Sequence, residues 1–175
     1  MKARRPPLRA LWIAVIALTV SCGDSTPTSL STAPAPDASL IGGLLGNLKL
    51  LQCSPMPAAS ATLTVGPGGG TIKVGPHTLV IPPGALSSSV TITAVAPSAT
   101  VNAVRFTPQG LTFRIPASLT MSYANCGLLN QLLPKKIVYT TDDLRILELL
   151  ASLDLLSYRK VTAPLRHFSQ YAVAW

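Results

Sequence analysis

Hydrophobic residues alternate with polar ones along most of the chain from Ala58 onward, which is the pattern of strands with one buried face. The apolar members of this pattern are Ala61, Leu63, Val65, Ile72, Val74, Val90, Ile92, Ala94, Leu111, Phe113, Ile115, Leu119, Met121 and Tyr123. Turns rich in Gly and Pro separate the stretches, as at residues 66–70, 82–84 and 107–110. This organisation predicts an all-β fold, with a single antiparallel β-sandwich over residues 58–175.

The pattern is less regular after residue 127. We expect a strand at residues 137–139, and a terminal strand in which Tyr171, Val173 and Trp175 share one face. Residues 128–134 fit a helical turn or a loop. Residues 144–150 and 155–161 fit two strands or one helix, and Asp154 between them favours a turn.

The N-terminus has the layout of an export signal. A basic stretch at residues 1–9 precedes an apolar stretch at residues 10–20, and Ser21 is a small residue before Cys22. Residues 18–22 resemble the lipobox of bacterial lipoproteins. The resemblance implies that residues 1–21 are a lipoprotein signal peptide, cleaved before Cys22, and that Cys22 carries a lipid anchor. A plain cleaved signal or a retained anchor is the alternative.

Residues 22–57 are expected to form a tether with a short apolar arm. Residues 23–38 are rich in Ser, Thr, Pro and Ala and contain almost nothing to bury, which predicts a disordered, semi-extended tether. Leucines recur at near-helical spacing in residues 39–51, but Gly42, Gly43 and Gly46 weaken a helix there. This arm either lies on the domain or touches the membrane or a partner.

Charge and length narrow the classes of partner. Removing residues 1–21 lowers the formal charge from +8 to +4, since 10 Lys and Arg remain against 6 Asp and Glu. The remaining cations are spread along the sequence without interleaved aromatic residues, so we expect no nucleic acid partner. The apolar stretch of the leader is shorter than the roughly 20 residues of a membrane-spanning helix.

Cysteine usage points to an oxidising compartment. Lipid on Cys22 would leave Cys53 and Cys126, and two thiols in an exported chain most simply form a disulfide. Two buried free thiols are the alternative. In the chain-entropy description, a bond between these cysteines would contribute about 4 kcal/mol to folding stability.

One set of motifs is more specific than generic β structure. The segment Ile81-Pro82-Pro83-Gly84-Ala85-Leu86 is the most distinctive part, and residues 69–74, 77–86, 90–93, 106–113, 116–120 and 167–171 follow the same family pattern. Over residues 58–175 the chain resembles the ZU-five domain of zona-occludens proteins, netrin receptors and ankyrins. The resemblance implies a β-sandwich used for protein contacts, and it does not imply a conserved enzyme.

Few residues suit catalysis or metal binding. The histidines are His77 and His167, and no metal-ligand spacing occurs, so we expect no metal and no cofactor. The pair Asp142-Asp143 fits a solvated turn better than a calcium site. Some domains that resemble this one cleave themselves within a His-Phe-Ser motif, which implies His167 as base and Ser169 as nucleophile. The alternative, which we favour, is that His167-Phe168-Ser169 only leads into the last strand.

Together these features predict a lipid-anchored β-sandwich of the bacterial cell envelope, acting as a protein-interaction or structural module and not as an enzyme. Its partners would be the membrane, through lipid on Cys22, and an envelope protein. The alternatives are self-cleavage at Phe168–Ser169 and binding of a small ligand or glycan. The leaflet, the partner and the oligomeric state do not follow from the sequence.

Overall fold

The structure, a computed structural model, describes residues 46–127 and 133–175. The expectations for the leader, Cys22, the tether, the first part of the apolar arm and most of residues 128–134 lie outside these residues. The described elements, in chain order, are β1 (Ala59–Val65), β2 (Gly70–Val74), β3 (His77–Ile81), β4 (Val90–Ala96), β5 (Ala103–Thr107), β6 (Thr112–Ser122), β7 (Lys136–Thr140), β8 (Ile146–Leu149), β9 (Leu153–Leu155), the 3-10 turn η2 (Leu156–Tyr158), β10 (Lys160–His167) and β11 (Gln170–Ala174).

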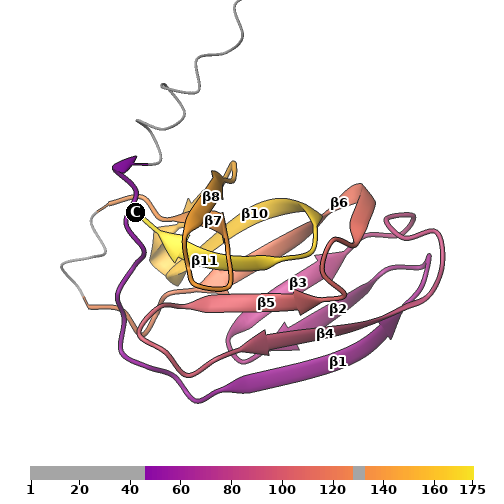
Figure 1. Cartoon of the computed structure of the whole chain (residues 1–175), viewed down its shortest axis with the longest axis horizontal. Coiled ribbons are helices and arrows are strands. Elements are labelled where there is room, and N and C mark those ends of the chain that lie inside the picture. The colour runs from indigo at the N-terminus through magenta and orange to yellow at the C-terminus, as the bar shows by residue number, and fades with distance from the viewer. Residues whose placement is uncertain (1–45, 128–132) are drawn as a thin grey trace, which may run out of the picture. The chain divides into compact units, whose positions relative to one another are not determined.

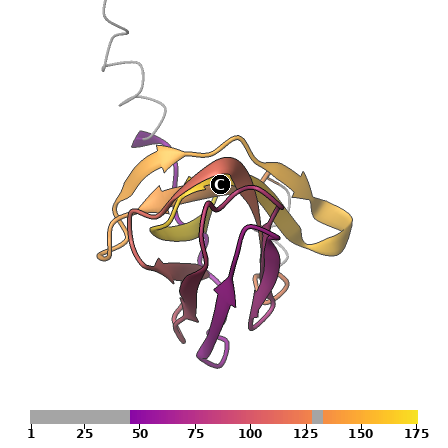
Figure 2. The same cartoon turned by 90° about the vertical axis from the view of Figure 1, so that its right-hand side faces the viewer.

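These strands form two antiparallel sheets packed face to face, as Figure 1 and Figure 2 show. One sheet has the order β1-β4-β5-β11-β7-β8, and the other has the order β2-β3-β6-β10-β9. We call them the six-stranded and the five-stranded sheet. The predicted all-β fold, a single antiparallel β-sandwich, is therefore confirmed.

The core lies between the two sheets and follows the predicted alternation in most strands. Ile72 and Val74 of β2 and Ile92 and Ala94 of β4 are buried, while the residues between them face outward or are partly exposed. Phe106 and Phe168 stack in the centre with their ring centroids 5.0 Å apart. Burial of one such apolar side chain contributes roughly 1.5–3 kcal/mol, so this shared interior is the main source of stability.

Two residues expected in the core are exposed. Leu63 is 42% exposed because β1 is an edge strand with β4 as its only sheet neighbour. Ile115 is 47% exposed because β6 loses its regular pairing there: Ala117 opposes Leu165, but the next aligned pair is Thr112 and His167. The alternating residues from Phe113 to Met121 belong to one irregular strand, β6, that passes through Pro116.

The last strand is buried on both faces. Tyr171 and Val173 belong to the main core, with Trp175 packed against it, so the predicted shared face is confirmed. Ala172 and Ala174 belong to a second apolar cluster on the other face, where Leu48, Leu50 and part of the β7–β8 hairpin cover them. β11 is therefore a fully enclosed strand.

The folded domain begins before Ala58, the start expected from the alternation. Leu51 is fully buried, its N–H donates to the Val173 carbonyl at 2.9 Å, and Leu50 forms a bridge with Ala174. β5 pairs with only the first part of β11, so this extended segment takes the position beside its last residues. The described part of the apolar arm thus lies on the domain.

The ambiguous region after residue 143 is β structure. Residues 146–149 form β8, and residues 153–161 form β9, η2 and the start of β10. Asp154 is not in a turn, as its polarity suggested, but in the middle of β9. It faces inward, where its carboxylate accepts hydrogen bonds from the Tyr123 hydroxyl at 2.6 Å and the Lys135 N–H at 2.8 Å.

Candidate functional site

The predicted pairing of Cys53 with Cys126 is present as a disulfide. It closes a separation of 73 residues and joins the arm segment to the end of β6. Buried Asn102 lies beside it and exchanges hydrogen bonds with the Asn125 side chain at 2.7 and 3.0 Å. The Asn125 side chain also donates to the Ser54 carbonyl at 2.6 Å. Covalent and polar contacts therefore fix the arm to one end of the sandwich.

The two glycine-proline segments of the sequence motif contact each other. Gly69 has a left-handed φ of 77°, and a Cβ there would lie 2.3 Å from the Ile81 carbonyl oxygen, so only glycine fits. The Gly84 N–H donates to the Pro67 carbonyl at 2.8 Å. The motif before β2 and the motif after β3 thus form one structural unit.

The motif segments at residues 106–113 and 167–171 also contact each other. The Phe168 N–H donates to the Leu111 carbonyl at 2.8 Å, and the Gly110 N–H donates to the Phe168 carbonyl at 3.0 Å. The Phe168 ring is buried between Phe106 and Phe113. Hydrogen bonds and ring packing therefore hold the turn at residues 107–110 against the His167-Phe168-Ser169 motif.

His167 and Ser169, the two residues that self-cleavage would use, are not joined by a side-chain hydrogen bond in the described part of the chain. His167 ends β10, and its Nδ1 lies 3.4 Å from the Tyr171 hydroxyl. Among the described non-glycine residues, positive φ occurs at Leu144 and Arg159, and not at Phe168 or Ser169. Gly110 does direct its N–H at the Phe168 carbonyl, the group that Ser169 would attack.

A row of side chains crosses three strands on the inner face of the six-stranded sheet. Tyr171 of β11 opposes Tyr139 of β7, and Tyr139 opposes Glu148 of β8. Directly opposed residues on neighbouring strands present their side chains to the same face. The row therefore runs from the buried Tyr171 to the exposed Glu148 at the sheet edge.

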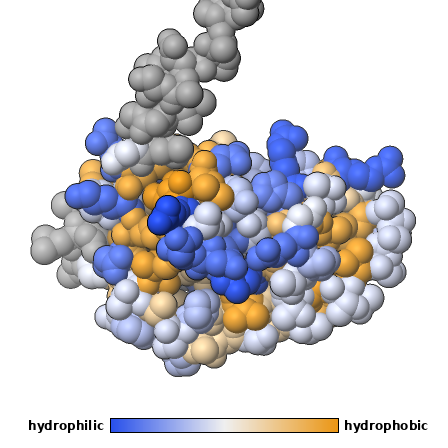
Figure 3. Space-filling model, viewed as in Figure 1, coloured by the Kyte–Doolittle hydropathy of each residue, from blue (hydrophilic) through white to orange (hydrophobic). Residues whose placement is uncertain are grey.

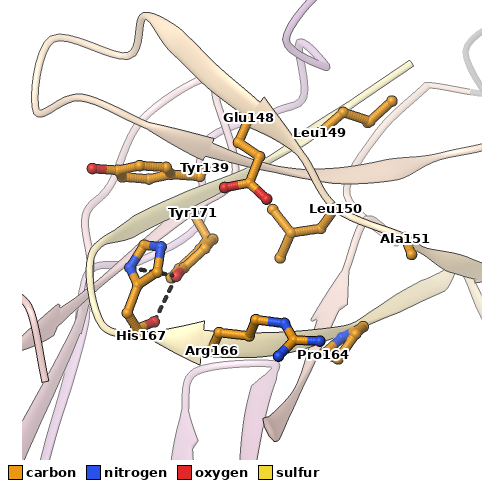
Figure 4. A pocket seen from close by; sticks show the side chains of 9 residues that line it. All are labelled: Tyr139, Glu148, Leu149, Leu150, Ala151, Pro164, Arg166, His167 and Tyr171. Atoms are coloured by element: carbon orange, nitrogen blue, oxygen red, sulfur yellow. Dashed lines mark hydrogen bonds between the residues drawn. The ribbon is translucent and has the colours of Figure 1, made fainter. Parts of the chain in front are cut away.

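This row forms one wall of an open pocket of about 260 Å³. Pro164, Arg166 and His167 of β10 form the opposite wall, and residues 149–151 close one side. The pocket exists because β9 pairs only with residues 160–162 of β10, so the later part of β10 is a free edge. Figure 4 shows Glu148 reaching in from β8 and Arg166 lying along β10.

The charges of the pocket are not neutralised within the described residues. The ion pairs among the described residues join Arg105 to Asp142 and Arg145 to Asp143, which lie outside the pocket. Neither Glu148 nor Arg166 takes part in an ion pair among these residues. Burial, and then the nearby Glu148 carboxylate, raise the pKa of Tyr171 well above its usual range. Tyr171 therefore stays protonated and donates to the His167 carbonyl at 2.6 Å. The pocket offers one anion, one cation and aromatic walls to a ligand.

Other candidates from the sequence have structural roles. His77 is buried and its Nδ1 accepts the Ser122 N–H at 3.1 Å, and burial lowers its pKa to about 4. Asp142 and Asp143 lie in the expected turn and pair with arginines. Over residues 46–127 and 133–175, no group of His, Cys, Asp and Glu side chains is arranged to hold a metal ion.

The surface gives two further findings. Figure 3 shows apolar surface gathered over the β7–β8 hairpin, beside a polar region in the middle of the same view. No helix in the described part of the chain is long and apolar enough to cross a membrane.

The chain matches no known protein-family model. No curated protein matches it significantly either. The pocket residues Tyr139, Glu148 and Arg166 were not among the residues expected to matter. The alternation around them is weak, and only strand pairing brings them together.

Proposed function

We propose that this protein is a lipid-anchored β-sandwich of the bacterial cell envelope that works as a protein-binding module. Residues 1–21 direct export, Cys22 carries the lipid, and the following residues tether the folded domain. The observation that carries the proposal is the Cys53–Cys126 disulfide in a chain whose remaining cysteine follows an export-like leader. Disulfides persist outside the reducing cytoplasm, which fits this location.

The binding role is supported by the pocket beside the free edge of β10. Glu148 and Arg166 face it without ion-pair partners among residues 46–127 and 133–175, and Tyr139 adds an aromatic wall. An exposed strand edge next to such groups suits an extended peptide segment, because backbone hydrogen bonds and side-chain pockets then act together. Pro164 on this edge has no N–H to donate, which limits pairing with unrelated strands.

A relationship to the ZU-five domain is part of the same proposal. It is supported by the way the motif residues meet: Gly69 packs on Ile81 and Pro82, and the segment at residues 106–113 packs on Phe168. These contacts explain why the motif needs its glycines and prolines. They concern the scaffold, and they leave the identity of the partner open.

The anchoring is tested by metabolic labelling. Labelled palmitate should enter the wild-type protein and should not enter Cys22→Ala. Equal labelling of both chains would refute a lipid on Cys22. Equal absence of label, with a shortened N-terminus in the mature protein, would support a plain cleaved signal instead.

The binding role is tested by affinity capture from native envelope membranes. The wild-type protein should retain a defined protein that Glu148→Gln with Arg166→Gln loses. The matched control is Arg145→Gln, an exposed arginine on the nearby turn that does not line the pocket. Loss of the partner in the control as well, or retention in the pocket variant, would remove the pocket from the interface.

A small ligand is the second candidate for the pocket, because its two opposite charges and its volume suit a zwitterion such as an amino acid or a short glycan carrying both charges. Isothermal titration with free amino acids would detect such binding directly. Saturable heat that Glu148→Gln abolishes, without any protein partner, would favour this function over protein binding.

Self-cleavage remains the alternative that denaturing mass spectrometry decides. We expect an intact C-terminus, since backbone strain at Phe168–Ser169 is required and the φ values show no outlier there. Loss of residues 169–175 that Ser169→Ala prevents would show that the Ser169 hydroxyl cuts the chain, and would make the protein self-processing.

A further inference from the structure

The most exposed apolar residues of the described domain lie together at one end of the five-stranded sheet. The most exposed large hydrophobic side chains are Tyr158 at 72%, Leu153 at 64% and Leu156 at 52%, all within β9 and η2. Leu155 and Leu133 are also exposed. Leu133 lies near this region because the backbone N–H of Lys135, two residues later, donates to the Asp154 carboxylate. We call Leu153, Leu155, Leu156 and Tyr158 the apolar tip. In Figure 2 the connection from β9 to β10 projects at the right.

The tip reverses the usual arrangement of a strand. In β9 the acidic residue, Asp154, faces inward, and the flanking leucines face solvent. A half-buried strand normally places its apolar residues inside. Clustered exposed apolar side chains on a monomeric domain usually mark an interaction surface, so the tip is not accounted for by folding alone.

The charges around the apolar tip indicate which kind of partner fits it. Arg159 and Lys160 follow Tyr158 directly and are exposed, and Lys136 is partly exposed at the start of β7. The acid of this region, Asp154, is occupied by Tyr123 and the Lys135 N–H. Leucine and tyrosine beside exposed cations match a surface with an apolar interior and anionic headgroups.

The position of the tip fits a membrane as well. β10 begins at the tip, where Lys160 opposes Ser122, and β7 begins at Lys136 opposite Ala174. The arm enters the domain beside Ala174 and Trp175. The tip and the point where the tether reaches the domain thus lie at the same end of the strands. A tether held at a lipid surface would present this end to it.

We propose that the apolar tip, with Arg159 and Lys160, docks the domain on an anionic lipid surface. Leu153, Leu156 and Tyr158 enter the interfacial region, and the two cations contact lipid phosphates. The orientation argument rests on the proposed anchoring at Cys22, whereas the tip chemistry does not. Docking would hold the pocket between β8 and β10 at a fixed height above the membrane.

The test uses residues 23–175, which contain every buried core residue from Leu51 to Val173 and carry neither leader nor lipid. The probe is vesicles of phosphatidylglycerol and phosphatidylethanolamine, compared with neutral phosphatidylcholine vesicles. We expect sedimentation with the anionic vesicles and weaker binding to the neutral ones. Leu156→Ser with Tyr158→Ser should lower the partition coefficient about tenfold or more. Arg159→Asn with Lys160→Gln should lower it by about fivefold for each charge.

The matched control is Leu63→Ser with Val80→Ser, which removes two exposed apolar side chains from β1 and β3, away from the tip. Its vesicle binding should stay within about twofold of the parent chain, and the melting temperatures of all variants should agree within a few degrees because every site is exposed. Equal losses in tip and control variants, or no binding to anionic vesicles, would overturn the proposal. A tip-dependent dimer without vesicle binding would overturn it in favour of a second copy of the chain.

The outcome is separable from that of the proposed function. Failed palmitate labelling with successful vesicle binding would leave lipid docking without a lipid anchor. Successful labelling with no vesicle binding would leave an anchored protein whose tip does not touch the membrane.

Discussion

The strands β11 and β9 use their apolar residues in opposite ways. β11 lies inside the six-stranded sheet, and all five of its residues are buried. β9 lies at the edge of the five-stranded sheet, and its two leucines are exposed while Asp154 between them faces inward. Hydrophobicity along the strand does not separate these two cases. The two strands differ in the number of layers that cover them.

The covering layers explain the contrast. The main core covers Tyr171 and Val173, and Leu48 and Leu50 of the arm cover the opposite face of β11. β9 has β10 as its only sheet neighbour, and no described segment covers its outer leucines. The arm therefore completes the fold at β11, whereas β9 is left available for contacts outside the domain.

Truncation after Arg166 should have the largest effect, because it removes β11 and the buried Phe168. Each large side chain lost is worth roughly 1.5–3 kcal/mol, and together they approach the stability of a whole domain, about 5–15 kcal/mol. We expect no cooperative thermal transition. A truncated chain that unfolds cooperatively near the wild-type temperature would show that β11 is not the centre of the fold.

Removing the disulfide should have the next largest effect, because it releases the arm that covers β11. Cys53→Ala with Cys126→Ala should lower the free energy of unfolding by about 4 kcal/mol, measured by denaturant titration. Peptide mapping without reductant should find the two cysteines crosslinked in the parent chain. Two freely alkylated thiols in the folded parent would contradict the pairing.

Buried His77 should make the stability of the core depend on pH. Its pKa is about 4 in the folded state against 6.5 in the unfolded chain, so the unfolded chain binds the extra proton between these values. The stabilising effect is complete above pH 6.5 and is lost as the pH falls toward 4, by about 3 kcal/mol. His77→Gln should flatten this part of the stability profile. Equal acid sensitivity in both chains would assign it to other groups.

Asp154 tests the inward face of β9. Asp154→Ala leaves the Tyr123 hydroxyl and the Lys135 N–H without their acceptor, which should cost about 2 kcal/mol of unfolding free energy. The control is Asp143→Ala, whose carboxylate is exposed and bonds to Thr141 and Arg145, and which should leave the free energy of unfolding nearly unchanged. Similar effects of the two substitutions would mean that the inward carboxylate is not structural.

Leu153 tests the outward face of β9 and should show the smallest effect. Leu153→Ala should change the free energy of unfolding by about 0.5 kcal/mol or less, because the side chain is mostly exposed. The same kind of truncation in β11, Val173→Ala, should cost about 2 kcal/mol. A large loss from Leu153→Ala would show that β9 is covered in solution, and would remove the apolar tip as a free surface.

Sequence reasoning could identify the fold class because the sandwich leaves a local signature. The alternation around Ile72, Ile92 and Leu119 reports one buried face, and the Gly and Pro turns mark the strand ends. The pairing of Cys53 with Cys126 could also be predicted, since only two cysteines remain once Cys22 is expected to carry lipid. These properties depend on short segments or on simple counting.

The same reasoning failed where burial depends on neighbours. Leu63 and Ile115 fit the alternation but are exposed, because one lies on an edge strand and the other at an irregularity of β6. Leu51 belonged to an apolar arm for which the sequence left two positions open, on the domain or at the membrane or a partner. It is fully buried, because the position beside the end of β11 accepts this segment. A one-dimensional pattern contains no information on which strands lie at an edge.

The candidate site could not be predicted from the sequence, because strand pairing brings its residues together. Tyr139, Glu148 and Tyr171 form a row only because β11, β7 and β8 are neighbours in that register. Arg166 lies across from them at a free edge only because β9 is short and begins opposite Thr162. The sequence by itself determined an all-β sandwich, its disulfide and its turn motifs, since local periodicity and composition carry them. Strand order and register decided the pocket, the enclosed β11 and the exposed tip, because each arises where segments distant in the sequence pair or fail to pair.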